Sequence, residues 1–142
     1  MSFFYSIKSL YSSFKIYLLS MAYNEFMADQ IDQILKEKNV NHAVKKMMGG
    51  LCYMVDDKMC FGIHFDKKKN MDLLMARIGE DVAMEVMDEV GCNPMDFTGR
   101  PMRGYVFVDP DGFDLQEDLE KWIQRCLDFN PIAKSSKKKK EK

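Results

Sequence analysis

The arginines are the residues in this sequence whose positions most directly suggest a binding site. Arg77 interrupts an apolar run, and Arg100 lies in a Gly-Arg-Pro-Met segment close to Asp96. A guanidinium group near a strand end pairs well with a carboxylate, which it can bind through two parallel hydrogen bonds. One interpretation is a site for an anion or an acidic peptide, with Arg103, Asp96 and Lys46 as further candidates. The other is a structural ion pair that holds the turn.

The remaining reactive residues form no recognisable catalytic or metal-binding pattern. Neither His42 nor His64 has a nucleophile at a recognisable spacing. Gly49-Gly50 is not followed by Lys-Ser or Lys-Thr, which excludes a P-loop. The cysteines at positions 52, 60, 92 and 126 contain no C-x-x-C pair, so we expect four reduced thiols and no zinc. We therefore expect no cofactor and no catalytic residue, and an unrecognised enzyme or small-ligand pocket stays as an alternative.

Charge divides the 142 residues into three regions. Residues 1–20 carry a net +2, residues 21–133 carry −8, and residues 134–142 carry +5. An acidic body is poorly suited to phosphate backbones, so nucleic acid binding is expected only through the tail lysines Lys137, Lys138, Lys139 and Lys140. That tail should be disordered, because it has nothing to bury and repels itself.

The first twenty residues are apolar, aromatic and rich in serine. Lys15 interrupts the run, which is too short for a membrane-spanning helix, and we expect no membrane association. We expect a disordered extension or an upstream mis-start, with a secretory signal as the alternative. Together with the reduced thiols, this favours a cytoplasmic protein with one domain over residues 21–133.

The apolar pattern of that domain predicts an α+β fold. Helices are expected over residues 23–38, 79–90 and 115–129, and strands over residues 48–55, 58–65, 71–78, 95–97 and 104–108. Asp56-Asp57 reads as a hairpin turn, and Asp109 to Gly112 as another turn. Short links between consecutive strands indicate a two-layer antiparallel sheet with helices, in the order α-β-β-β-α-β-β-α.

Helix boundaries and inner faces follow from the same pattern. Asn39 is expected to stop the first helix and Gly91 the second, and a capping box from Asp114 to Glu117 should open the third. The inner face of the second helix is assigned to Val82, Val86, Met87 and Val90, and that of the third to Leu115, Leu119, Trp122, Ile123, Cys126 and Leu127. The 13 methionines are expected mainly in the core, with an adaptable partner surface or a copper site as alternatives.

Two motifs carry a family resemblance. Lys45-Lys-Met-Met-Gly-Gly50 with the strand and Asp-x-Lys-Met pattern that follows, and Met95-Asp-Phe-Thr-Gly-Arg-Pro-Met102 with Gly104 to Val108, resemble the two halves of the TfoX N-terminal domain. The resemblance covers residues 21–133 and implies a two-layer domain similar to the secretion-chaperone fold, which often dimerises. The competence regulator of the family has a further C-terminal helical domain with no counterpart here, so we do not expect control of competence.

The most economical expectation is a non-catalytic interaction or regulatory module that acts through protein contacts. We expect a homodimer and a protein partner of unknown identity. A nucleic-acid-associated regulator that uses the lysine tail is the first alternative.

Overall fold

The computed structural model describes residues 25–47, 50–96 and 101–134. The chain divides into two compact units, residues 1–38 and residues 39–142. In the first unit residues 25–37 form a helix, and a turn leads to Asn39, whose φ is 58°. The predicted first helix and its asparagine stop are therefore confirmed over the described residues.

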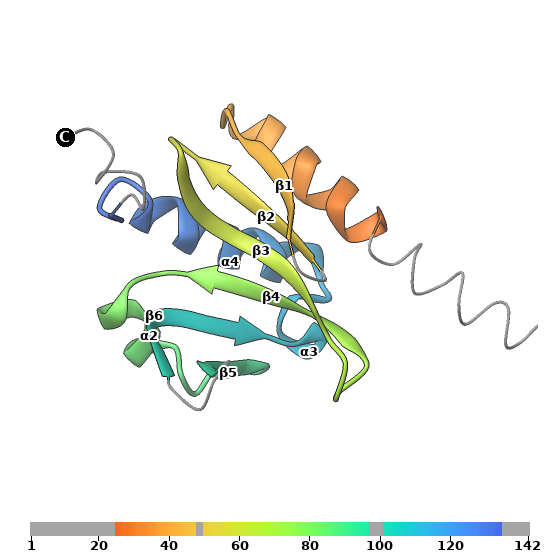
Figure 1. Cartoon of the computed structure of the whole chain (residues 1–142), viewed down its shortest axis with the longest axis vertical. Helices are drawn as coiled ribbons and strands as arrows, with labels where there is room; N and C mark the ends of the chain where they lie inside the picture. Colours follow the sequence, from red (N-terminus) through yellow and green to blue (C-terminus); the bar gives the residue numbers. More distant parts are fainter. Residues whose placement is uncertain (1–24, 48–49, 97–100, 135–142) are drawn as a thin grey trace, which may run out of the picture. The chain divides into compact units, whose positions relative to one another are not determined.

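The second unit is built on a six-stranded antiparallel sheet with the strand order β1-β2-β3-β4-β6-β5 (Figure 1). The strands are β1 (Ala43–Met47), β2 (Gly50–Val55), β3 (Lys58–Asp66), β4 (Met71–Arg77), β5 (Cys92–Asp96) and β6 (Pro101–Val108). Neighbours in the chain are neighbours in the sheet except where β6 inserts between β4 and β5.

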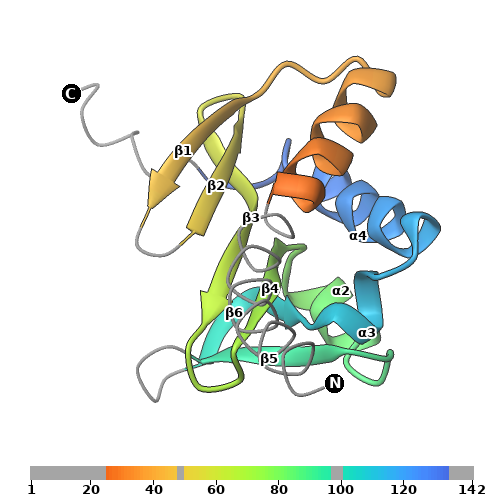
Figure 2. The same ribbon diagram turned by 90° about the vertical axis from the view of Figure 1, so that its right-hand side faces the viewer.

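Three helices of this unit, α2 (Glu80–Glu85), α3 (Pro110–Phe113) and α4 (Gln116–Phe129), lie on one side of the sheet (Figure 2). On the sheet, Ala76 pairs with Val106 and Leu74 with Val108, and all four side chains are fully buried. Trp122 of α4 is buried as well, and its Nε1 donates to the carbonyl of Gly112 at 3.1 Å. The α+β class and the predicted element order are thus confirmed.

The Asp56-Asp57 turn forms as predicted. Val55 pairs with Lys58 across it, and the two aspartates have φ values of 56° and 62°. Positive φ at both central residues is typical of a type I′ turn, whose twist matches that of the flanking strands. Aspartate tolerates this left-handed conformation better than most residues, which explains how the turn forms without glycine.

Two elements were not predicted. The first is β1, an edge strand in which the side chains of Val44, Lys45 and Lys46 are exposed. Because two of its five residues are lysines, the sequence shows no apolar run that would predict a strand here. Lysines are a common device for protecting a sheet edge from unwanted pairing. The second is α3, where a turn was expected: Asp109 caps it by accepting from the amide of Asp111 at 3.1 Å. In addition, β5 begins at Cys92, three residues earlier than predicted.

The prediction for the second helix was wrong in its C-terminal half. The helix α2 ends at Glu85, and the chain continues in tight turns, with the amide of Glu89 bonded to the carbonyl of Val86 at 2.9 Å. Val86 is buried, but Met87 and Val90 are exposed instead of lying on an inner face. Gly91 does adopt a positive φ of 79°, but within a turn and not as a helix stop.

The predicted start of the last helix was also wrong. Leu115 occupies the N-cap position with no side-chain hydrogen bond, so no capping box forms from Asp114, and the Leu115 side chain is 61% exposed. Of the remaining stripe, Leu119, Trp122, Ile123 and Cys126 are buried as predicted, whereas Leu127 is only half-buried. The helix ends at Phe129 as predicted, with Asn130 as its C-cap.

Candidate functional site

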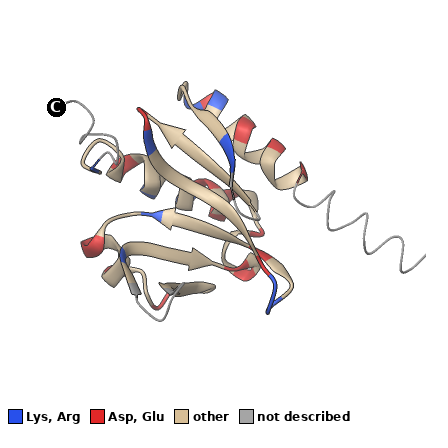
Figure 3. Ribbon diagram, viewed as in Figure 1, with Lys and Arg blue, Asp and Glu red and all other residues tan. Residues whose placement is uncertain are grey.

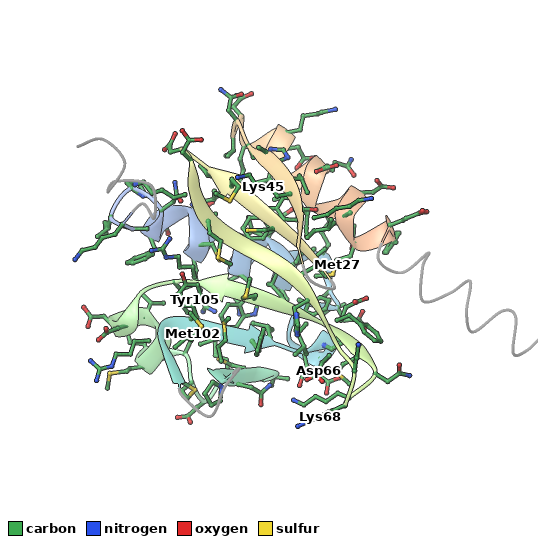
Figure 4. The ribbon with its side chains drawn as sticks, viewed as in Figure 1. Met27, Lys45, Asp66, Lys68, Met102 and Tyr105 are labelled. Atoms are coloured by element: carbon green, nitrogen blue, oxygen red, sulfur yellow. The ribbon has the colours of Figure 1, made fainter. Side chains whose placement is uncertain are left out.

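A pocket of about 260 Å³ lies where α2 meets β5 and β6. Four methionines line it, two from α2 and the turn after it (Met84 and Met87), one from β5 (Met95) and one from β6 (Met102). Glu80 and Arg103 supply the charged groups of its wall, with Ala83, Pro94, Gly104 and Tyr105 completing it. Figure 4 labels Met102 and Tyr105 on β6, near one edge of the sheet. We refer to this cavity as the methionine pocket.

Local backbone geometry creates the pocket. The pairing of β5 with β6 shifts register between Pro94 and Asp96, which interrupts the regular ladder beside the cavity. On the other side, the carbonyl of Gly104 accepts from the amides of Ile78 and Gly79 at 2.9 and 3.0 Å. Gly104 has a φ of 81°, and a Cβ there would lie 3.3 Å from the Cα of Gly79. The two glycines therefore let the start of α2 approach β6 closely.

The rim of the pocket is exposed while its floor is buried. Met84, Met87 and Met102 are 78%, 38% and 40% exposed, whereas Met95 is only 3% exposed. Val90, at 70%, extends the exposed apolar surface beyond the pocket. We call Met84, Met87, Val90 and Met102 the methionine patch. Flexible thioether side chains around a concave site can adapt to an apolar group of varied shape.

The turn after α2, which carries Met87 and Val90 of the methionine patch, is anchored to α4. Arg125 donates two hydrogen bonds to the Glu89 carboxylate, at 3.0 and 2.6 Å, and its guanidinium lies 4.5 Å from the centroid of the Trp122 ring. Lys121 is a further 3.6 Å ion partner of Glu89. The hydrogen bonds from Arg125 are the main reason that the pKa of Glu89 is lowered from its ordinary value. This clamp fixes the turn between Met87 and Val90.

Of the predicted binding residues whose side chains the structure describes, only Arg103 lies at the methionine pocket. Lys46 lies on β1, at the opposite edge of the sheet, as the position of its neighbour Lys45 in Figure 4 also shows. Asp96 ends β5, and Arg100 lies outside the described residues, as do the tail lysines Lys137, Lys138, Lys139 and Lys140. The predicted start of the domain at residue 21 also lies outside the described residues, which begin at position 25, whereas its predicted end at residue 133 lies within them.

Arg77 is committed to backbone acceptors. Its Nη1 donates to the carbonyl of Met59 at 3.2 Å, and its Nη2 to the carbonyl of Lys134 at 3.0 Å. The guanidinium also lies 5.6 Å from the ring centroid of Tyr105 and 6.0 Å from that of Phe129. These contacts tie β4 to β3 and to the segment after α4, which favours a structural role for this arginine.

Lys58, in the Asp-x-Lys-Met part of the first family-like motif, also has a structural role. Lys58 follows the hairpin turn, and its Nζ donates to the carbonyl of Asn130 at 2.9 Å, at the C-terminal end of α4. A cation there interacts favourably with the helix dipole. Asn130 in turn donates from Nδ2 to the carbonyl of Val55 at 3.2 Å. These hydrogen bonds hold the β2–β3 hairpin against the end of α4, and we call Lys58 and Asn130 the hairpin clamp.

The histidines and cysteines lie away from the methionine pocket. His64 stacks on Phe107 at a centroid distance of 5.5 Å, and His42 lies 6.0 Å from the ring of Tyr53. All four cysteines are free thiols. Burial raises the pKa of Cys60 to about 12 and raises that of Cys126 well above its ordinary value. Among the described residues, no three His, Cys, Asp or Glu side chains are grouped so that they could hold a metal ion.

The sequence prediction missed the methionine pocket because it placed Met84 and Met87 on a regular helix. A period of three residues from Met84 through Met87 to Val90 was the available signal. Figure 3 shows that charged residues are sparse on the strands apart from β1, which carries Lys45 and Lys46.

Comparison with known proteins identifies one family. The model of the TfoX N-terminal domain family matches residues 37–130, which is well over half of the chain. No curated protein and no solved structure gives a significant match. Within the described ranges, no helix has the length and apolar character needed to cross a membrane.

Proposed function

The chain belongs to the TfoX N-terminal domain family, and we propose that it is a non-catalytic regulatory module that binds a protein partner through the methionine pocket. The single observation that carries this proposal is the combination of a concave apolar site with exposed methionines on its rim. Exposed apolar groups that gather around a cavity are typical of interaction sites.

The size of the pocket favours a side chain over a cofactor. Its volume of about 260 Å³ falls below the range of about 300–1,000 Å³ that is usual for small-molecule sites. An apolar side chain presented by a protein needs less room, and Met95 offers it a buried floor. The methionines around it can adjust their rotamers to the incoming group.

The nucleophilic side chains outside the pocket favour a binding role over catalysis. Thiols with pKa values raised as far as those of Cys60 and Cys126 stay protonated near neutral pH, and a protonated thiol is a poor nucleophile. Free cysteines also suit a reducing compartment, and we propose the cytoplasm as the site of action.

The test is affinity capture with three versions of the full chain: wild type, Met84→Glu, and Ile132→Glu as a matched control. Ile132 is 73% exposed and lies after α4, away from the pocket. We expect proteins that wild type retains to be lost with Met84→Glu and kept with Ile132→Glu, at equal melting temperatures. Identical retention by all three versions would exclude the pocket as the docking site.

A homodimer is a second proposal, and an apolar cluster that shares Met95 and Tyr105 with the methionine pocket supports it. Leu73, Phe107 and Met95 form an apolar cluster with Met71, Met75 and Tyr105 packed against it. Leu73 and Phe107 alternate with Leu74 and Val108, whose side chains are fully buried, so they lie on the opposite face of the sheet. Sedimentation of the full chain tests this: we expect a dimer that Met75→Lys dissociates, and a strict monomer would refute it.

A further inference from the structure

We propose that the methionine pocket binds a basic amphipathic helix of a partner protein; this inference rests on the function proposed above. Three features of the surface around the pocket support a helical, basic partner: the spacing of the exposed apolar residues, the surrounding charge, and the irregular neighbouring sheet edge.

Three exposed apolar residues follow one another closely in the segment formed by α2 and the turns after it. After α2 the amides of Glu89 and Cys92 bond to carbonyls three residues back, at 2.9 and 3.1 Å. Met84, Met87 and Val90 are three residues apart along this segment, and all three are exposed. We call them the apolar row. An amphipathic helix presents apolar side chains at intervals of three and four residues, so one of its faces suits such a set of exposed positions.

The charge around this row is acidic. Residues 80–90 contain five carboxylates and no lysine or arginine. Glu89 is held by Arg125, but Glu80, Asp81, Glu85 and Asp88 are exposed beside the apolar positions. An apolar row flanked by carboxylates is complementary to a helix with apolar residues on one face and lysine or arginine on the other. Arg103 lies on the sheet side of the pocket, so the acidic surface ends there.

The neighbouring sheet edge is a poor site for an extended peptide. The edge strand β5 has only five residues, and one of them is Pro94, which has no amide proton to donate. Its pairing is also irregular next to the pocket. Strand addition requires a regular run of free donors and acceptors, so a helical partner is favoured at this edge.

In the complex, one apolar side chain of the partner helix enters the pocket over Met95, and its neighbours pack on Met84, Met87 and Val90. The basic side chains of the partner face Asp81, Glu85 and Asp88. Binding by this mode weakens with added salt, because these charges are exposed to solvent.

The experiment uses the full chain and two fluorescent probe peptides of 18 residues. One is an amphipathic helix of leucine and lysine, and the other has the same pattern with glutamate in place of lysine. We expect the lysine probe to bind at least about tenfold more tightly than the glutamate probe, as charge complementarity requires. The methyl NMR signals of Met84, Met87 and Met102 should shift on binding, and that of Met59 on β3 should not.

Two variants test the charge separately from the fold. The triple change Asp81→Asn, Glu85→Gln and Asp88→Asn should weaken lysine-probe binding about tenfold. The control Asp114→Asn with Glu117→Gln, on the exposed start of the last helix, should leave it unchanged. Equal binding of both probes, equal effects of both variant sets, or shifts outside the pocket would overturn the inference.

The outcome also separates this inference from the proposed function. If neither probe binds but capture from lysate still depends on Met84, the partner is not a basic helix and the docking function stands. If capture does not depend on Met84, the proposed function itself fails.

Discussion

The two ends of the sheet use their side chains in opposite ways. Around the hairpin clamp, where β2 and β3 meet the end of α4, the polar side chains of Lys58 and Asn130 are committed to backbone carbonyls. Around the methionine pocket, where β5 and β6 meet α2, apolar side chains are left in solvent. The contacts of the first end stabilise the fold, and the second end is the surface that we propose for binding. Substitutions should therefore separate stability from binding according to the end at which they fall.

The largest expected contrast is between a core position and the patch. Ile123→Ala on α4 removes a fully buried side chain and should lower the free energy of unfolding by about 2–5 kcal/mol. Met84→Ala removes an exposed one and should change that free energy by less than about 0.5 kcal/mol. Chemical denaturation of both variants measures the difference, and a similar loss at Met84 would place that side chain in the core.

The hairpin clamp should have the next largest effect. Lys58→Met removes the donor that satisfies the carbonyl of Asn130 and should cost about 1–2 kcal/mol of folding free energy. Lys68→Met, on the exposed turn after β3, is the matched control and should stay within about 0.5 kcal/mol of wild type. Equal stabilities of the two variants would show that the clamp contributes nothing.

The Glu89–Arg125 pair should contribute less, because it is partly exposed. Glu89→Gln should cost about 1 kcal/mol at neutral pH. The pKa of Glu89 is lowered in the folded chain, mainly by its hydrogen bonds to Arg125. The contribution is thus present above the unfolded pKa of about 4.3 and is lost as the pH falls through the folded value. Denaturation of both proteins from pH 7 to pH 3 should show the difference closing, whereas a constant difference would contradict this assignment.

The contrast between the two ends also explains what the sequence could predict. The Asp56-Asp57 turn and the apolar stripe from Leu119 to Cys126 depend on neighbouring residues, so local patterns were sufficient. The row of Met84, Met87 and Val90 depends on where α2 ends. The turn that follows α2 is held by the hydrogen bonds between Arg125 and Glu89, which are 36 positions apart in the sequence. No local pattern contains that information.

The arginines illustrate the same limit. Residue types indicated that Arg77 needs acceptors and offered Asp96 as a candidate. Its acceptors in the structure are the carbonyls of Met59 and Lys134, 18 and 57 positions away. Backbone carbonyls are present at every residue, so a sequence does not mark which ones a guanidinium will reach. Arg103, by contrast, lies at the methionine pocket, but the sequence did not predict the apolar residues that surround it there.

The smallest expected effect, and the one with the opposite pH dependence, is at Asp72 on β4. This side chain is buried, and burial raises its pKa above the ordinary value. The folded chain therefore binds this proton more readily than the unfolded chain, whose aspartates titrate near about 3.9. Above the folded pKa the buried charge lowers the stability, and this penalty disappears as the pH falls below the unfolded pKa.

Asp72→Asn removes this titration. We expect the variant to be at least as stable as wild type at pH 7, and wild type to gain stability relative to it as the pH is lowered. Comparing the two proteins by denaturation over the same pH range as for Glu89 gives a direct contrast, because the two carboxylates should show slopes of opposite sign. If the stability differences at Asp72 and at Glu89 changed with pH in the same direction, burial would not control the titration of Asp72.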